Sequence, residues 1–400
     1  MAPSYPVALG RKIAEARHRR GLSQAQLAGM IDRSVAWISQ VERGARKVDR
    51  MSVLEMLADA LQLPLSELAA EAPIVAAVHH EPPGVAELRL VLSGAWTLRA
   101  MLSHDDAHVP KGLRERATRA WSLSLESRYA ELADELRDLI PDLETSVRTV
   151  PSGQRGEMFE LLATSYQACA AALSKLGETD AAWIAADRSM AAAERAGNPL
   201  LVAAGAFRLG IVFIGARQYA QAAEISGTAA DALWRVAEGG TMEAMSIWGA
   251  ITLQRATVAA RLGEATAAYG FIDWARLAAK RVGPGRNDFN TEFGMANVDL
   301  YEVDIAVELG DAGRALRVAT AIDVASLSAE RQTQLLIDVA RAHTQRRQPA
   351  QALTALLEAE GLAPEQIRSH ARVRQVLADL RTMQPPPAAL AALTTRLTTP

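Results

Sequence analysis

The chain is poor in cysteine and in aromatic residues. Cys169 is its one cysteine in 400 residues, so neither a disulfide framework nor a cysteine zinc site can form within one chain. We expect Cys169, in an Ala-rich stretch, to be a small core residue. Aromatic residues make up only 5% of the sequence while alanine is abundant, a combination that favours closely packed helices over sheets. The composition therefore predicts an all-α protein.

Long apolar runs are also missing. No stretch reaches the roughly 20 apolar residues of a membrane span, and residues 1–6 lack the apolar run of a signal peptide. We therefore expect a cytoplasmic protein with no membrane segment. Half of the residues are hydrophobic, which is enough for a large core, and 400 residues predict two or three domains.

Catalytic motifs are absent as well. The sequence contains no H-E-x-x-H zinc-protease motif and no G-x-S-x-G nucleophile elbow. The loop Gly283-Pro284-Gly285-Arg286 is rich in turn residues but lacks the Lys-Ser/Thr ending of a phosphate-binding loop. The many carboxylates fit exposed helix faces. We predict that the protein is not an enzyme, and we expect no cofactor and no metal.

Positive charge is concentrated near the N-terminus. The whole chain has a net charge of −3, yet residues 11–50 hold ten Arg or Lys against four Asp or Glu. Such a basic stretch is the electrostatic footprint expected of a nucleic-acid-binding segment.

Within this basic stretch, Gly21 to Gly44 reads as two short helices joined by a tight turn. Ser23 and Gln26 form an S-x-x-Q capping box that begins the first helix. Leu27 and either Met30 or Ile31 face inward, and Ala28 is small where two helices must approach closely.

The second helix is predicted to begin at Ser34, a capping residue, and to end at Gly44. Ile38 and Val41, three residues apart, point toward the core. The opposite face is exposed, short-chained and uncharged except at its end, which suits the floor of a DNA groove better than open water. That face consists of Val35, Ala36, Ser39, Gln40 and Arg43.

The residues of these two predicted helices follow the pattern of a known family. The patterns G-L-S-Q-x-x-L-A and I-S-x-x-E-R-G resemble the Xre/Cro/phage-repressor class of helix-turn-helix proteins. Asp32 departs from the pattern, because many members have glycine in the turn. A helical hairpin with an accidental motif is the alternative, but both helices, the cap and the terminating glycine agree with the resemblance.

The resemblance implies a double-stranded DNA partner. It places Val35, Ala36 and Gln40 toward base edges in the major groove, where the Gln40 amide can pair with adenine. The phosphate anchors are expected to be Gln24, Arg43, Arg46 and Lys47. The full set of predicted DNA-binding residues is Gln24, Ser34, Val35, Ala36, Trp37, Ser39, Gln40, Arg43, Arg46 and Lys47. Trp37 fits either the phosphate backbone or the space between helices.

The predicted domain order is a five-helix repressor-like DNA-binding domain at 1–72, a linker at 73–84 and an α-helical, tetratricopeptide-like body at 85–400. The linker contains three prolines and the His79–His80 pair. His104 and His108 stand four residues apart in an expected loop. We interpret His79–His80 as part of a solvated linker, because no spaced partner ligands follow. His104 and His108 could chelate a metal from one helix face, but they precede Pro110 in a loop, so we expect no metal there either.

In the body, residues 85–102 and 111–150 have helical periodicity, with an interruption expected at Pro141. An internal repeat follows, whose spacings of roughly 37 to 47 residues exceed the ~34 of the tetratricopeptide repeat. The expected turns are Gly177, Arg217, Gly263, Gly310 and Arg347. Small residues recur five residues later at Ala182, Ala222, Ala268, Ala315 and Ala352. A generic Ala-rich bundle remains the alternative.

A ligand site is predicted on the concave side of the repeats. Polar residues recur there within otherwise apolar helices: Arg208, Gln254, Asn297, Tyr301, Asp338 and Arg341. Amides can hold a peptide backbone, and an arginine can take a carboxylate bidentately. Ordinary inter-helix salt bridges, such as Asp338 with Arg341, are an equal alternative.

Together these features predict a DNA-binding transcriptional regulator. We expect a homodimer on a palindromic operator, because one such domain covers few base pairs. The body would dimerise and sense a peptide or small-molecule effector. The alternative is a helical-repeat scaffold for another protein, with DNA contact secondary.

Overall fold

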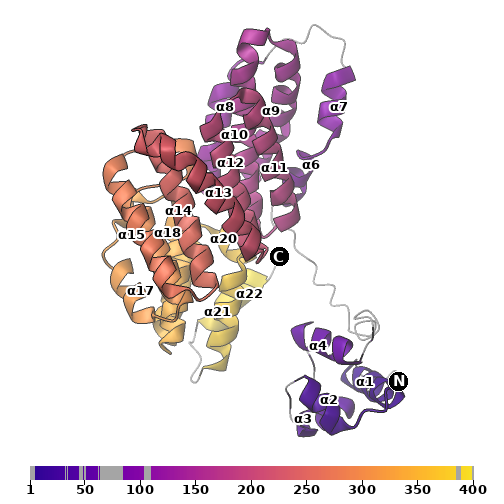
Figure 1. Ribbon diagram of the computed structural model, residues 1–400. Helices are drawn as coiled ribbons and strands as arrows, with labels where there is room; N and C mark the ends of the chain where they lie inside the picture. Colours follow the sequence, from indigo (N-terminus) through magenta and orange to yellow (C-terminus); the bar gives the residue numbers. More distant parts are fainter. Residues whose placement is uncertain are drawn as a thin grey trace. The chain divides into compact units, whose positions relative to one another are not determined.

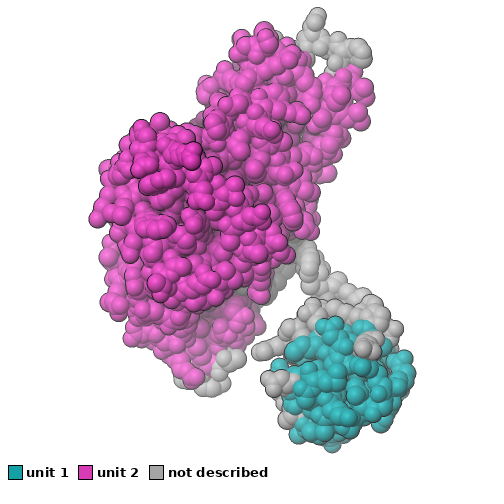
Figure 2. Space-filling model, viewed as in Figure 1, with its two compact units in different colours: residues 1–81 teal, residues 82–400 magenta. Residues whose placement is uncertain are grey.

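The computed structural model describes residues 5–31, 33, 35–44, 48, 51–61, 63, 84–102, 110–383 and 389–398. The chain divides into two compact units, residues 1–81 and 82–400 (Figure 2). Across the described residues every regular element is an α-helix or a 3₁₀ helix, so the predicted all-α class is confirmed. Several predictions lie outside these residues: Ser34, Arg46, Lys47, the fifth helix after Pro64, and the two His pairs.

Four helices are described in the first unit (Figure 1). They are α1 (Tyr5–Arg19), α2 (Gln24–Met30), α3 (Val35–Glu42) and α4 (Met51–Leu61). The predicted inward residues of the motif are buried: Leu27, Ala28, Ile38 and Val41. Of the two alternatives at the end of α2, Ile31 is buried and Met30 is exposed. One small core therefore holds all four helices together.

The predicted cap and the predicted terminating glycines of these helices are also present. The Ser23 side chain accepts a hydrogen bond from the Gln26 N–H, and the Gln26 side chain accepts one from the Ser23 N–H. Gly21 and Gly44 follow α1 and α3 with φ of 64° and 69°, a conformation in which glycine carries no Cβ penalty. Gly10 serves another need, because a Cβ there would collide with the main-chain oxygens of Val41 and Glu42. Glycine at this position lets α1 and α3 pack backbone to backbone.

The second unit begins with α6 (Val85–Leu90), α7 (Ala95–Leu102), α8 (Leu113–Leu125) and α9 (Tyr129–Thr149). Residues 85–102 therefore form two helices rather than one continuous run. The interruption expected at Pro141 is wrong, since α9 continues through it. Interior proline costs ~3 kcal/mol or more, but Leu139, Ile140 and Leu143 around it are completely buried. Their burial outweighs the local penalty.

Five helix pairs follow. The first members are α10 (Ser152–Leu176), α12 (Pro199–Gly215), α14 (Met242–Arg261), α16 (Met295–Glu308) and α18 (Ala329–Gln345). The second members are α11 (Thr179–Ala196), α13 (Tyr219–Glu238), α15 (Ala265–Val282), α17 (Ala312–Ala319) and α19 (Pro349–Leu362). The predicted turn residues separate the members of each pair, with φ of 83° at Gly177, 60° at Arg217, 78° at Gly263, 83° at Gly310 and 56° at Arg347.

Small residues pack the pairs together as the repeat predicts. The column Ala182, Ala222, Ala268, Ala315 and Ala352 is buried throughout. The repeated helical body is therefore confirmed. Cys169 is buried on α10, in agreement with a core role, and burial raises the pKa of its thiol to about 12.

The chain ends with α20 (Pro364–Ser369), α21 (Ala371–Thr382) and α22 (Leu390–Thr398), while η1 (Asp288–Asn290) and η2 (Val324–Ser326) are short 3₁₀ turns. Figure 1 shows α20 to α22 beside the later helix pairs. Among the described helices, none is long and apolar enough to span a membrane. Within the same residues, no three His, Cys, Asp or Glu side chains gather in a way that could hold a metal ion.

Candidate nucleic-acid interface and ligand cavity

Helix α3 presents an exposed face opposite its buried side. Val35, Ala36, Gln40 and Arg43 are exposed, and Ser39 is half-buried. Val35 is 46% exposed although valine is apolar, so it is available for contact. The Arg43 guanidinium donates a hydrogen bond from Nε to the Ser39 carbonyl at 3.1 Å, which places its charge at the C-terminal end of the face. These residues form one short surface suited to a groove.

Trp37 lies at the edge of this surface. It is half-buried and packs against the core of the first unit. The Arg33 guanidinium lies 5.9 Å from its ring centroid. Of the two placements that the sequence left open, the structure thus shows Trp37 in contact with the helical core.

The interior side of α3 is fixed by an ion pair with α1. Arg17 Nε lies 2.6 Å from Glu42 Oε1, and both side chains are less than a tenth exposed. Arg17 also donates to the Leu22 carbonyl at 2.8 Å, and the Gln24 amide donates to Glu42 Oε2 at 2.7 Å. Glu42 therefore connects α1, the start of α2 and α3. This arrangement holds α2 and α3 in a fixed relation.

The protonation of this pair follows from its contacts. Burial alone would raise the pKa of Glu42, but hydrogen bonds from Arg17 and Gln24 and the charge of Arg17 bring that pKa below its usual value. The hydrogen bond to Glu42 raises the pKa of Arg17 in turn. Both groups are charged at neutral pH.

Gln24 was predicted to anchor a phosphate. Its side-chain amide is engaged with Glu42, so the side chain is held at the N-terminus of α2. The first main-chain N–H groups of a helix have no helical carbonyl to bond and suit an anion. The side-chain amide of Gln24 is thus used within the domain, and its main-chain N–H stands at the first position of α2.

In the second unit, the first members of the helix pairs line a cavity of about 500 Å³. Of the predicted ligand residues, Gln254, Tyr301 and Asp338 line it. Arg208, Asn297 and Arg341 do not. The spacing of the repeat therefore brings half of the predicted set to one cavity.

Arg208 instead lies in the interior. It is 4% exposed, and its guanidinium donates to the carbonyls of Phe289 and Asn290, at 3.3 and 2.6 Å. The group sits 4.7 Å from the Trp121 ring centroid and 5.0 Å from that of Phe207. Burial lowers the pKa of Arg208 to about 9. Its contacts hold the loop before α16.

Asn297 is also buried. Its amide donates to the Thr291 carbonyl at 3.5 Å, which ties α16 to the same loop.

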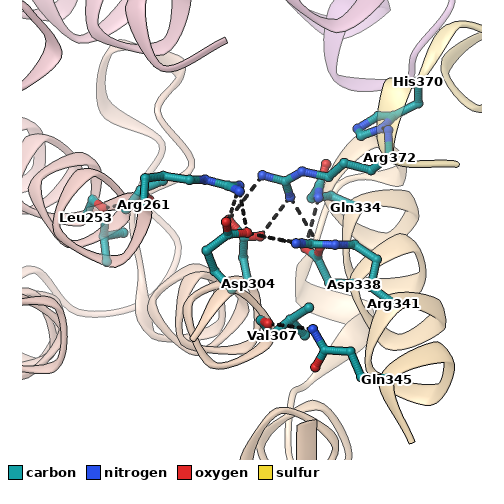
Figure 3. A network of polar contacts seen from close by, with 12 residues as sticks. Leu253, Arg261, Asp304, Val307, Gln334, Asp338, Arg341, Gln345, His370 and Arg372 are labelled. Carbon is teal, nitrogen blue, oxygen red and sulfur yellow. Dashed lines mark hydrogen bonds and ion pairs between the residues drawn. The ribbon is translucent and has the colours of Figure 1, made fainter. Parts of the chain in front are cut away.

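Arg341 belongs to an ion network beside the cavity (Figure 3). Two carboxylates, Asp304 and Asp338, share the guanidinium groups of Arg341 and Arg372, with oxygen–nitrogen distances of 2.7 to 3.3 Å. Arg261 adds a third cation 3.8 Å from Asp304. The pairing of Asp338 with Arg341 that the sequence offered as an alternative is present, but both residues are on α18, so the pair lies within one helix. The ion pairs between helices join Arg341 to Asp304 and Glu308 on α16.

Several members of these clusters were not among the predicted site residues, Glu42 and Arg372 among them. Glu42 entered the sequence analysis only as the glutamate of the I-S-x-x-E-R-G pattern. Arg17 on the inward face of α1 could have indicated it, because a buried arginine requires an acidic partner. Arg372 reaches Asp304 from α21, beyond the last repeat. No periodicity could have indicated it.

Comparison with known proteins identifies the first unit. Residues 8–70 match the helix-turn-helix domain family. The N-terminal unit contains a helix-turn-helix domain. No match is found among curated proteins. One solved structure is similar to this chain: the crystal structure of Bacillus thuringiensis PlcR in complex with the peptide PapR7 and DNA. The alignment spans 70% of this chain and 100% of the PlcR chain, with 15% sequence identity and a TM-score of 0.24.

Proposed function

We propose that the protein is a sequence-specific DNA-binding regulator of transcription, whose helical body dimerises and senses a peptide or small-molecule effector. The observation that carries the proposal is the exposed, mostly uncharged face of α3 within a helix-turn-helix domain. Short uncharged side chains allow close approach to base edges. The basic residues around the motif supply the attraction to phosphate.

The first test is base readout by Gln40. Its exposed amide can donate to and accept from adenine. Gln40→Ala is expected to cost about 1–3 kcal/mol on the preferred site and to relax one base position. Arg43→Ala should instead weaken binding to all sequences and reduce the salt dependence. Fluorescence anisotropy with a set of single-base variants of the site measures both effects.

A matched control is Gln154→Ala, an exposed glutamine at the start of α10 in the second unit. It should leave DNA affinity unchanged. Unaltered base preference in Gln40→Ala would show that α3 does not read the sequence in this way.

The second test is the oligomeric state. Two half-sites about 34 Å apart require two domains held at a fixed spacing. A helical-repeat array also has end faces that need a cap or a second copy. Light scattering at micromolar concentration is expected to give twice the chain mass. A monomer both free and on DNA is incompatible with this part of the proposal.

A scaffold for another protein is the second candidate function. Three tryptophans on second members of the helix pairs favour it, because Trp183, Trp234 and Trp274 are 46%, 41% and 50% exposed. Exposed tryptophan is typical of protein interfaces. A scaffold would form a stable complex with a partner protein and show weak sequence preference on DNA.

A further inference from the structure

We propose that the helical body opens and closes at one polar seam, where its last helices contact its first helices. The seam consists of the contacts of α8, α9 and α10 with α18 and α20. Three observations carry the proposal: the polar nature of these contacts, the interruption of the apolar cores at the seam, and the position of the cavity behind it. The opening is a property of the body alone, whereas its use by an effector rests on the proposed function.

Helix α20 caps the start of α9 from the far end of the chain. Glu365 Oε2 accepts hydrogen bonds from the main-chain N–H groups of Tyr129 and Ala130, at 2.9 and 3.4 Å. Beside them the Ser127 hydroxyl donates to Gln366 Oε1 at 3.1 Å. The first N–H groups of a helix have no carbonyl partner within that helix. The carboxylate of Glu365 therefore supplies acceptors that α9 itself lacks.

An ion pair forms the second contact of the seam. Lys175, near the end of α10, pairs with Glu330 on α18, and the glutamate side chain is 7% exposed. Arg331 lies 3.4 Å from the other oxygen of Glu330, so this carboxylate is held by cations from both sides of the seam. The named contacts across the seam are thus hydrogen bonds and ion pairs.

Apolar packing, by contrast, joins the rest of the body continuously. One core extends from α6 to α14, the next from α12 to α16, a third from α16 to α18 and a fourth from α18 to α22. Each core shares at least one helix with the next. Among the described residues, no core contains side chains from both sides of the seam. Regions with few buried apolar contacts open at lower free energy than the cores do.

The cavity lies behind the seam. Ser174 and Lys175 on α10 line it from one side, and Arg331 on α18 and His370 after α20 line it from the other. His370 stands at the start of α21, where its Nδ1 accepts a hydrogen bond from the Arg372 N–H at 3.2 Å (Figure 3). Opening of the seam therefore separates two parts of the cavity wall. A molecule that contacts both parts binds the closed state better and shifts the body toward it.

Two spin labels measure the opening by the distance between them. Ser122→Cys on α8 and Arg368→Cys on α20 place labels at exposed positions on the two sides of the seam. Arg317→Cys on α17 with Glu358→Cys on α19 is the control pair, because apolar cores that share α18 join these helices. The native Cys169 is buried and should not take a label.

A seam variant should reveal the open state. Lys175→Met with Glu365→Ala removes the ion pair and the acceptor of the α9 N–H groups. We expect a second, longer distance across the seam in this variant and an unchanged distance in the control pair. Lys280→Met with Glu224→Ala makes the same changes at exposed positions of α15 and α13, and it should keep the single distance of the parent chain.

Hydrogen exchange tests whether the seam opens as a unit. Lys175→Met leaves Glu365 in place, yet it should speed exchange of the Tyr129 and Ala130 N–H groups about tenfold, because loss of the ion pair favours the open state. The Ala244 N–H, which the Thr241 side chain caps within the same turn, is the internal reference and should not change.

Three results would overturn the proposal. They are a single unchanged distance in the seam variant, loss of the control-pair distance together with the seam distance, and unchanged exchange at Tyr129 and Ala130 in Lys175→Met. The second result would mean that the body unfolds rather than opens. Neither DNA nor an effector is present in these measurements, so their failure leaves the proposed function standing, and failure of DNA selection would not alter them.

Discussion

Replacing Glu42 with alanine is expected to destabilise the helix-turn-helix domain by about 3–5 kcal/mol and to abolish DNA binding. The substitution leaves the Arg17 guanidinium, 7% exposed at the side chain, without its carboxylate. It also releases the Gln24 amide at the N-terminus of α2. The total stability of a folded domain is roughly 5–15 kcal/mol, so this loss is a large fraction of it.

Hydrogen exchange of residues 5–61 in the full chain measures this loss locally. The matched control is Arg17→Met with Glu42→Met, which removes both charges and leaves no buried ion alone. It should cost much less than Glu42→Ala. Equal exchange rates in Glu42→Ala and the parent chain would mean that the ion pair does not hold α3.

The same pair predicts acid sensitivity. The folded pKa of Glu42 is lowered, so its contribution to stability is present above the unfolded pKa and is lost as the pH falls through the folded value. Exchange protection in residues 5–61 should therefore decline in acid through this group, and the double methionine control should lack that part of the decline.

Asp304→Asn is expected to destabilise the helical body by about 3–5 kcal/mol. Asp304 lies among Arg261, Arg341 and Arg372, which come from three other helices. Burial would raise the pKa of Asp304, but these arginines hold it well below its usual range. An uncharged amide at this position would leave the three arginines with only two carboxylate partners, Asp338 and Glu308.

Asp299→Asn on the same helix is the control. Asp299 contacts Arg276 at 2.9 Å, but Arg276 keeps Glu302 as a second partner. Its replacement should cost less than about 1 kcal/mol. Urea unfolding of the full chain compares the two variants, and a similar midpoint for both would contradict the importance assigned to the network.

Local signals in the sequence predicted much of the fold. Ser23 with Gln26, Gly21 and Gly44 bound the helices where predicted, because capping and positive φ depend on a few adjacent residues. The recurring turn residues and the small residues five positions after them located the helix pairs, because turns and close helix packing also depend on a few adjacent residues. Pro141 shows the limit of local rules, since burial of its neighbours keeps α9 continuous.

The sites were less accessible to sequence reasoning. The exposed face of α3 follows from helical periodicity once Ile38 and Val41 are placed inward. In the body, equivalent repeat positions have different environments. Arg208 holds a loop, whereas Gln254 lines the cavity. The environment of such a position depends on contacts that are distant in the sequence. Arg208, for example, bonds to carbonyls 81 and 82 residues away, and helical periodicity does not predict such contacts.

Selection and sequencing of the DNA fragments retained by the purified full-length protein tests the central claim most directly. We predict enrichment of one motif built from two half-sites related by two-fold symmetry, about 34 Å apart. In the Gln40→Ala variant one base position in each half-site should lose its preference. Retention of DNA with no enriched sequence would contradict sequence-specific binding by α3.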